Sequence, residues 1–175
     1  MKEKITVLID RETVENRIQE IADEISRDYE GKCVHLIGIL KGSVMYMTEL
    51  AKRLSIPATF DFMSVSSYGD GTSSSGIVRI SKDTDEGLEG KDVIIVEDIV
   101  DSGRTLSYLL ELMQGRHPNS LKLTTLLDKP DRRVRDVHVD YDGFVIPDKF
   151  VVGYGLDYAQ RYRNLPYIGV VTFEE

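Results

Sequence analysis

Three short apolar runs without alternation constrain the fold of this chain more than any other feature. They are Cys33–Leu40, Val93–Val96 and Leu121–Leu127. A strand that is apolar almost throughout is typical of a sheet covered on both faces, because both sets of side chains then leave water. We therefore expect these runs to be buried strands, with Cys33 as a small core side chain.

Segments with helical spacing of apolar residues alternate with the strand-like runs. We expect helices at Arg11–Tyr29, Ser43–Leu54 and Arg104–Gln114, and further strands at Ile5–Ile9, Ala58–Ser66, Ile77–Ser81, Val137–Val139, Phe150–Val152 and Ile168–Phe173. This alternation predicts an α/β fold, with a mostly parallel, twisted sheet and helices on both faces. Without a repeat or linker, residues 1–175 are expected to form a single domain.

Charge and cysteine content narrow the function classes. The formal net charge of -8 argues against a general nucleic-acid or membrane-surface binder, because both need a basic face. The N-terminus lacks the apolar core of a signal peptide, and no apolar run approaches the ~20 residues of a membrane span. The single cysteine excludes an intrachain disulfide. We expect a cytoplasmic protein.

An acidic strand end followed by a small-residue turn is the most informative motif. Glu97 and Asp98 directly follow the apolar run at Val93–Val96, and Asp101 begins a turn formed by Ser102, Gly103, Arg104 and Thr105. Two adjacent carboxylates are costly to desolvate, and sugar hydroxyls or a hard divalent cation would offset that cost. Backbone N–H groups at the start of the next helix form a ready phosphate site.

Other interpretations of this motif stay open on the local pattern alone. A polar strand end followed by a helix cap, with Asp101 or Ser102 as the N-cap residue, has the same residues. No G-x-x-x-x-G-K-[ST] segment occurs, so a P-loop kinase is disfavoured. A flavodoxin-like redox domain has the same alternation of strands and helices, but nothing in the sequence requires a flavin.

The complete string Val93–Leu106 resembles the phosphoribosyl-pyrophosphate motif of the type I phosphoribosyltransferases. Further segments are similar to the hypoxanthine (hypoxanthine-guanine) branch of that family. They are Leu40-Lys41-Gly42-Ser43, Ser67-Tyr68, Lys129, Ile146–Tyr158 and Arg163. The resemblance covers nearly the whole chain and implies a hood, formed by the N- and C-terminal segments, beside the main sheet.

The resemblance also implies an activity. It is the magnesium-dependent transfer of the 5-phosphoribosyl group from phosphoribosyl pyrophosphate to N9 of hypoxanthine or guanine. Glu97, Asp98 and Asp157 are expected to hold Mg²⁺, and Asp101 to act as the acid or base at N7. Residues 97, 98 and 101–105 are expected to bind the sugar phosphate. The family's oligomers imply a homodimer or homotetramer.

The remaining family positions concern pyrophosphate, the purine and a lid. Lys41, Gly42 and Arg163 correspond to pyrophosphate-binding positions, with a cis peptide between Leu40 and Lys41. The expected purine site consists of Lys129, which donates to the 6-oxo group, together with Phe150, Val151 and Asp157. Ser67 and Tyr68 correspond to a lid. Two alternatives remain, a xanthine-preferring enzyme and a non-catalytic nucleotide-sensing regulator with this fold.

Overall fold

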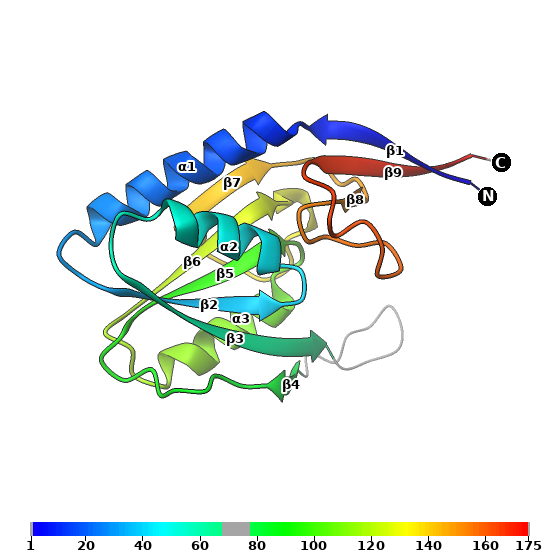
Figure 1. Cartoon of the computed structure of the whole chain (residues 1–175). Helices are drawn as coiled ribbons and strands as arrows, with labels where there is room; N and C mark the ends of the chain where they lie inside the picture. The colour runs from blue at the N-terminus through cyan, green and yellow to red at the C-terminus, as the bar shows by residue number, and fades with distance from the viewer. Residues whose placement is uncertain (1, 68–77, 175) are drawn as a thin grey trace.

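The computed structural model describes residues 2–67 and 78–174 (Figure 1). The helices are α1 (Arg11–Asp28), α2 (Val44–Arg53), α3 (Arg104–Gln114) and a 3₁₀ turn, η1 (Pro130–Arg132). The strands are β1 (Lys2–Ile9), β2 (Val34–Leu40), β3 (Ala58–Ser67), β4 (Val78–Lys82), β5 (Asp92–Val100), β6 (Ser120–Asp128), β7 (Tyr141–Val145), β8 (Val151–Val152) and β9 (Ile168–Glu174). None of the helices in these ranges is long and apolar enough to cross a membrane.

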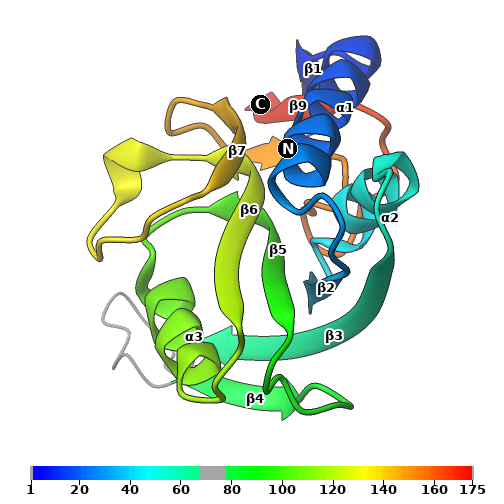
Figure 2. The ribbon, with the colours of Figure 1, turned by 90° about the vertical axis from the view of Figure 1, so that its left-hand side faces the viewer.

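Six strands form the main sheet in the order β4-β3-β2-β5-β6-β7. All neighbouring pairs are parallel except β3 and β4, which are antiparallel. The sheet is strongly twisted, with α1 and α2 on one face and α3 on the other (Figures 1 and 2). The predicted mostly parallel α/β sheet with helices on both faces is therefore confirmed.

The helices form where the sequence supplies both a start signal and an apolar face. Asp10 caps α1, since its side chain accepts a hydrogen bond from Thr13 N at 2.8 Å. On the opposite face of the sheet, α3 begins after Gly103, whose φ of 81° is left-handed. Each helix buries one apolar stripe, so the sheet separates two hydrophobic cores.

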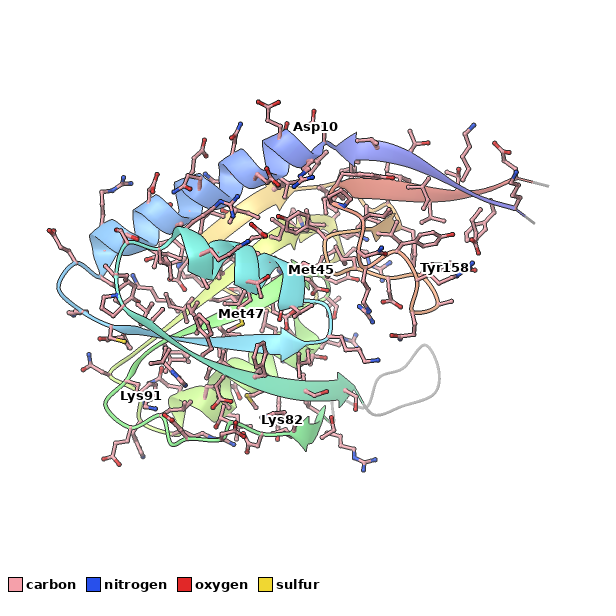
Figure 3. All side chains as sticks on the ribbon, viewed as in Figure 1. Asp10, Met45, Met47, Lys82, Lys91 and Tyr158 are labelled. Atoms are coloured by element: carbon pink, nitrogen blue, oxygen red, sulfur yellow. The ribbon has the colours of Figure 1, made fainter. Side chains whose placement is uncertain are left out.

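A second, three-stranded antiparallel sheet has the order β1-β9-β8 and forms the predicted hood. It joins the two ends of the chain, because Lys2 pairs with Glu174 and Ile9 with Ile168. Figure 1 shows the hood beside the carboxyl ends of the main strands. In Figure 3, Tyr158 of the hood lies at this end of the molecule, whereas Lys91 lies at the amino end of β5. Ligands of parallel sheets bind at the carboxyl ends, so the site is expected beneath the hood.

Two local predictions are wrong. Val137–Val139 is not a strand; both valines pack against the α3-side core, and pairing with β6 begins instead at β7. Asp140 ends the loop, because its N–H donates to Leu123 O at 3.0 Å while its side chain accepts from Leu123 N at 2.8 Å. Cys33 precedes β2 and is exposed, so it is not a core residue.

Candidate functional site

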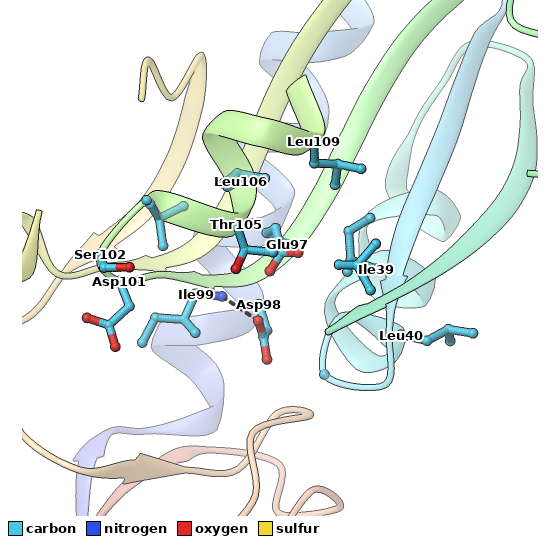
Figure 4. A pocket seen from close by; sticks show the side chains of 14 residues that line it. Ile39, Leu40, Glu97, Asp98, Ile99, Asp101, Ser102, Thr105, Leu106 and Leu109 are labelled. Carbon is cyan, nitrogen blue, oxygen red and sulfur yellow. Dashed lines mark hydrogen bonds between the residues drawn. The ribbon is translucent and has the colours of Figure 1, made fainter. Parts of the chain in front are cut away.

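A pocket of about 270 Å³ lies where β2 and β5 end (Figure 4). It brings together two segments that are far apart in the sequence, the Leu40–Gly42 loop and the acidic motif. Its lining includes Gly42, Glu97, Asp98, Asp101, Ser102, Gly103 and Thr105. Apolar side chains, among them Ile39, Leu106 and Leu109, complete the wall. The pocket thus combines carboxylates, hydroxyls and backbone amides at the edge of a buried core.

Strand geometry places the two adjacent carboxylates on opposite faces of β5. Ile95 packs in the α3-side core and Val96 in the core beneath α1 and α2. Because side chains alternate along a strand, Glu97 follows Ile95 and Asp98 follows Val96. Figure 4 shows Glu97 beside Thr105 of α3, and Asp98 on the other side of the strand.

Both carboxylates are partly buried and hold protons more tightly than exposed acids do. Burial raises the pKa of Glu97 well above its ordinary value, and the neighbouring charge of Asp98 adds to this effect. Burial also raises the pKa of Asp98, although the N–H of Ile99 donates to its Oδ1 at 2.7 Å. Such a pair favours a ligand that brings positive charge or hydroxyl donors.

The turn after Asp101 presents backbone amides at the start of α3. Gly103 is the N-cap residue, and its carbonyl accepts from Ser107 N at 2.9 Å. Since glycine has no side chain to cap the first turn, the amides there are suited to an anion. A Cβ at Gly103 would lie 2.7 Å from the carbonyl oxygen of Arg135, so a larger residue does not fit.

The Leu40–Gly42 loop approaches both the acidic motif and the hood. The peptide bond between Leu40 and Lys41 is cis, as the family resemblance implied. A Cβ at Gly42 would lie 1.9 Å from Oδ2 of Asp98, and a Cβ at Gly155 would lie 1.9 Å from the carbonyl oxygen of Gly42. Glycine at both positions therefore allows the acidic motif and the segment around Gly155 to pack closely against the Leu40–Gly42 loop.

Gly42→Ala is a direct test of this close packing. The added methyl group displaces the Asp98 carboxylate, so we expect roughly 10-fold weaker binding of any ligand that this carboxylate contacts. Isothermal titration with phosphoribosyl pyrophosphate and Mg²⁺ measures the change. Gly87→Ala is the matched control, because a Cβ at Gly87 meets nothing within 4 Å. Equal affinity of both variants and the parent protein would contradict the close approach.

The hood loop, residues 153–167 between β8 and β9, brings three further predicted residues together: Lys41, Asp157 and Arg163. Gln160 Oε1 accepts from Lys41 Nζ at 3.3 Å and from Arg163 Nη2 at 3.1 Å. Asp157 Oδ1 lies 3.3 Å from Arg163 Nη2, and its Oδ2 accepts from Gln160 N at 2.8 Å. Two cations and a carboxylate thus share one polar cluster. Sequence reasoning missed Gln160, because no spacing rule relates it to Lys41.

The predicted purine-contacting residues lie on the segments that follow β6 and β7. Lys129 is buried, and its Nζ lies 3.7 Å from Oδ1 of Asp148. Val151 is buried in β8, whereas the Phe150 ring is 52% exposed. Phe150 meets Tyr158 edge-on, with 5.8 Å between ring centroids. One face of an aromatic ring and one buried cation are thus available to a planar, polar ligand.

The three carboxylates predicted to hold a metal do not form one cluster. Across residues 2–67 and 78–174 there is no group of three or more His, Cys, Asp or Glu side chains arranged around a common point. Glu97 and Asp98 lie in β5, whereas Asp157 belongs to the hood loop. The structure therefore separates the acidic pair Glu97–Asp98 from the single carboxylate of Asp157.

Of the predicted lid, Ser67 ends β3 and Tyr68 lies outside the described residues.

Two arginines beside Asp101 were not predicted as site residues. Arg132 Nε donates to Asp101 Oδ1 at 3.1 Å, and Arg132 Nη1 lies 3.5 Å from Oδ2 of Asp148. Arg133 Nη1 donates to the Asp101 carbonyl at 2.9 Å. The only sequence signal is a basic pair shortly after Lys129, which is ordinary for a solvated turn.

Comparison with known proteins identifies the family. The phosphoribosyl transferase domain model matches residues 8–159. The hypoxanthine-guanine phosphoribosyltransferase of Bacillus subtilis is 52% identical over 165 residues, which cover 94% of this chain and 92% of that protein. The bifunctional protein TilS/HprT of Listeria monocytogenes is 53% identical over 168 residues; these are 96% of this chain but only 26% of that longer protein.

Solved structures agree with the sequence comparisons. A crystal structure of a Staphylococcus aureus hypoxanthine phosphoribosyltransferase superposes with a TM-score of 0.93 at 50% identity, covering 95% of this chain and 91% of that one. The match includes both the main sheet and the hood, since so much of each chain is covered. From the domain model, the relatives and the shared fold, we conclude that the chain belongs to the phosphoribosyltransferase family.

Proposed function

We propose that this protein transfers the 5-phosphoribosyl group from phosphoribosyl pyrophosphate to N9 of hypoxanthine, and also to guanine, in purine salvage. The products are IMP or GMP and pyrophosphate. One observation carries the proposal: the acidic pair Glu97–Asp98 and the amide-rich turn before α3 line the same pocket. Relatives at about half identity are named for this reaction, which supports the choice of base.

In this proposal the sugar phosphate lies along the acidic motif. The 5-phosphate accepts hydrogen bonds from the turn Ser102–Thr105 at the N-terminus of α3. Glu97 and Asp98 bind the ribose hydroxyls, directly or through Mg²⁺. The raised pKa of each carboxylate, caused by burial, is consistent with a pair that gains from a cationic or donating ligand.

The pyrophosphate group is assigned to the polar cluster of the hood. Lys41 and Arg163 supply positive charge, and Gly42 allows close approach of the backbone. Asp157 would supply an oxygen ligand for Mg²⁺ here, whereas the separate acidic pair would supply oxygen ligands for Mg²⁺ beside the ribose. When bound, Mg²⁺ neutralises charge on the departing pyrophosphate. The residues of the chain hold the ribose and exclude water while the anomeric carbon becomes cation-like.

The purine is assigned to the space beside Asp101, Lys129 and Phe150. Asp101 accepts or stabilises the N7 proton as N9 attacks the anomeric carbon. The ring stacks on Phe150, and the backbone of Val151 contacts the edge of the base. Asp157 lies near this edge in the family pattern. Ser67 and Tyr68 are assigned to a lid over the reaction centre.

Lys129 is expected to control the choice of base. Its ammonium group has only donors, so it matches a 6-oxo group and opposes the 6-amino group of adenine. An unmatched buried donor costs about 1–3 kcal/mol, which corresponds to roughly 10–100-fold discrimination. We expect Lys129→Gln to narrow the ratio of kcat/KM between hypoxanthine and adenine by about that factor, because an amide both donates and accepts.

The measurement is the rate with each base in parallel. Lys52→Gln, at an exposed position on α2, is the matched control and should keep the parent ratio. If the parent protein uses adenine as fast as hypoxanthine, the assigned role of Lys129 is wrong.

The central test is pyrophosphate release with hypoxanthine, guanine, xanthine and adenine, with and without Mg²⁺. The proposal expects rapid release with hypoxanthine and guanine, dependent on the metal. A dominant rate with xanthine indicates the xanthine-preferring alternative. Binding of phosphoribosyl pyrophosphate without turnover of any base indicates a nucleotide-sensing regulator. The expected cytoplasmic location and homodimer or homotetramer remain predictions, to be tested by fractionation and light scattering.

A further inference from the structure

The segment after η1 packs closely against the turn that follows Asp101. The carbonyl of Ser102 accepts from Val134 N at 2.9 Å and from Arg135 N at 3.2 Å. The absence of a side chain at Gly103 makes room for this contact, since a Cβ there would lie 2.7 Å from the carbonyl oxygen of Arg135. Residues 133–135, which belong to another part of the sequence, thus pack against the proposed phosphate turn and hydrogen-bond to its backbone.

The side chain of Arg133 fixes this contact through two hydrogen bonds. Its Nη1 donates to the carbonyl oxygen of Asp101 at 2.9 Å, and its Nη2 donates to Oδ1 of Asp128 at 2.5 Å. The two side chains of the ion pair are only 18% and 12% exposed. Because the pair is little hydrated, removing either partner leaves the other charge buried and unpaired, which is costly.

Asp128 is in turn held at the end of β6, beside the proposed purine-contacting lysine. The carbonyl of Asp128 accepts from Ile146 N at 2.9 Å, and Lys129 N donates to the carbonyl of Val100 at 3.0 Å. Arg133 therefore joins two strand ends. One carries Asp101 and the phosphate turn after β5, and the other carries Lys129 after β6.

We propose that Arg133 is a positioning residue for the transfer reaction: its guanidinium, anchored on Asp128, sets the backbone of Asp101 and the phosphate turn relative to Lys129. The inference rests on the proposed function. The physical requirement is geometric, because N7 and the 6-oxo group belong to one rigid purine. Asp101 and Lys129 can engage both groups only at a set separation, and small misplacements of reacting groups lower rates strongly.

Only the forked donor geometry of an arginine guanidinium can make both hydrogen bonds, to Asp128 and to the Asp101 carbonyl, at once. The planar guanidinium directs two N–H groups to two acceptors at once, one a carboxylate and one a carbonyl. A lysine ammonium keeps the charge on a compact group and does not reproduce the planar fork. Methionine retains much of the apolar stem but donates no hydrogen bond, so it separates packing from positioning.

The experiment compares Arg133→Met, Arg133→Lys, Asp128→Asn and the double variant Arg133→Met/Asp128→Asn in the full chain. We expect kcat of Arg133→Met to fall by roughly 100-fold, with an intermediate loss for Arg133→Lys. The double variant should be no slower than Arg133→Met, because the two residues act as one unit. The matched control is Arg11→Met, since Arg11 is exposed on α1 and lies outside residues 133–135.

Chemical rescue distinguishes positioning from a general loss of structure. Adding methylguanidinium to Arg133→Ala should restore part of kcat, whereas methylammonium should not, because only the former has the planar fork. Circular dichroism at the assay temperature gives the folded fraction. The inference is overturned if kcat of Arg133→Met equals that of the parent or falls only with the folded fraction. Independent, additive losses for Arg133 and Asp128 would also overturn it.

Assays of the parent protein distinguish failure of the proposed function from failure of the role of Arg133. If it forms no nucleotide from hypoxanthine and phosphoribosyl pyrophosphate with Mg²⁺, the proposed function fails and this inference fails with it. If the parent is active and Arg133→Met is equally active, only the role of Arg133 is wrong.

Discussion

Asp101→Asn is expected to lower kcat by roughly 10²–10⁴-fold, the usual contribution of a positioned acid or base. Asn keeps the size of the side chain and can still accept a hydrogen bond, but it cannot take up the N7 proton. Asp101 lies in the pocket wall at the start of the proposed phosphate turn, with Arg132 Nε 3.1 Å from its Oδ1. This ion pair is exposed and screened by solvent. The Asp101 carboxylate can therefore rotate toward the purine at little energetic cost.

Steady-state rates at saturating base and phosphoribosyl pyrophosphate measure this effect. Asp136→Asn is the matched control, because Asp136 is exposed on the loop that precedes β7. We expect the affinity of the Asp101 variant for phosphoribosyl pyrophosphate to change much less than kcat, since the backbone of the turn is unaltered. An unchanged kcat would remove Asp101 from proton transfer, and an equal loss in the control would point to a general electrostatic effect.

The double variant Glu97→Gln/Asp98→Asn is expected to bind phosphoribosyl pyrophosphate and Mg²⁺ roughly 10²–10⁴-fold more weakly. Hydrogen bonds to charged groups contribute about 1.5–3 kcal/mol each, and two such groups are lost. Isothermal titration at constant Mg²⁺ measures the affinity. Asp23→Asn/Glu30→Gln, with the same change of charge at exposed positions near the end of α1, is the control.

The same double variant should be more stable than the parent protein in the absence of ligand. Burial raises the pKa of Glu97 well above normal and raises the pKa of Asp98. For an acid whose folded-state pKa is raised, the folded state binds more protons than the unfolded state, so the free energy of unfolding falls as pH rises from the ordinary to the raised value. The amides do not titrate, and we expect a gain of about 0.5–2 kcal/mol at pH 8.

Urea unfolding from pH 4 to pH 9, without Mg²⁺ or ligand, checks this trend. The parent should lose stability with rising pH relative to the double variant, and the two curves should converge at acid pH. A double variant that is less stable than the parent at pH 8 would mean that the acidic pair is satisfied within the protein. The acidic pair would then not need a bound cation or ligand hydroxyl groups to offset the cost of its burial.

The central strands, the helices and the acidic motif were predictable because each depends on neighbouring residues. The apolar runs became β2, β5 and β6, and the helical spacing at Arg104–Gln114 gave the observed bounds of α3. The acids at the end of β5 needed no tertiary information, because a strand places them at its carboxyl end. The prediction of a strand at Val137–Val139 was wrong because it also rested only on neighbouring residues. Two valines separated by one residue match strand alternation, even where they pack against a core from a loop.

The amino-acid sequence by itself determined the parallel α/β sheet, the place of the acidic strand end and the turn Ser102–Thr105 that follows it, since these follow from local periodicity and from residues adjacent in the chain. Only the tertiary structure decided that Lys41 meets Arg163 through Gln160, and that Arg133 links Asp128 to the backbone of Asp101. Those contacts join side chains on separate elements. Their distances depend on how the strands twist and pack, which no spacing along the chain encodes.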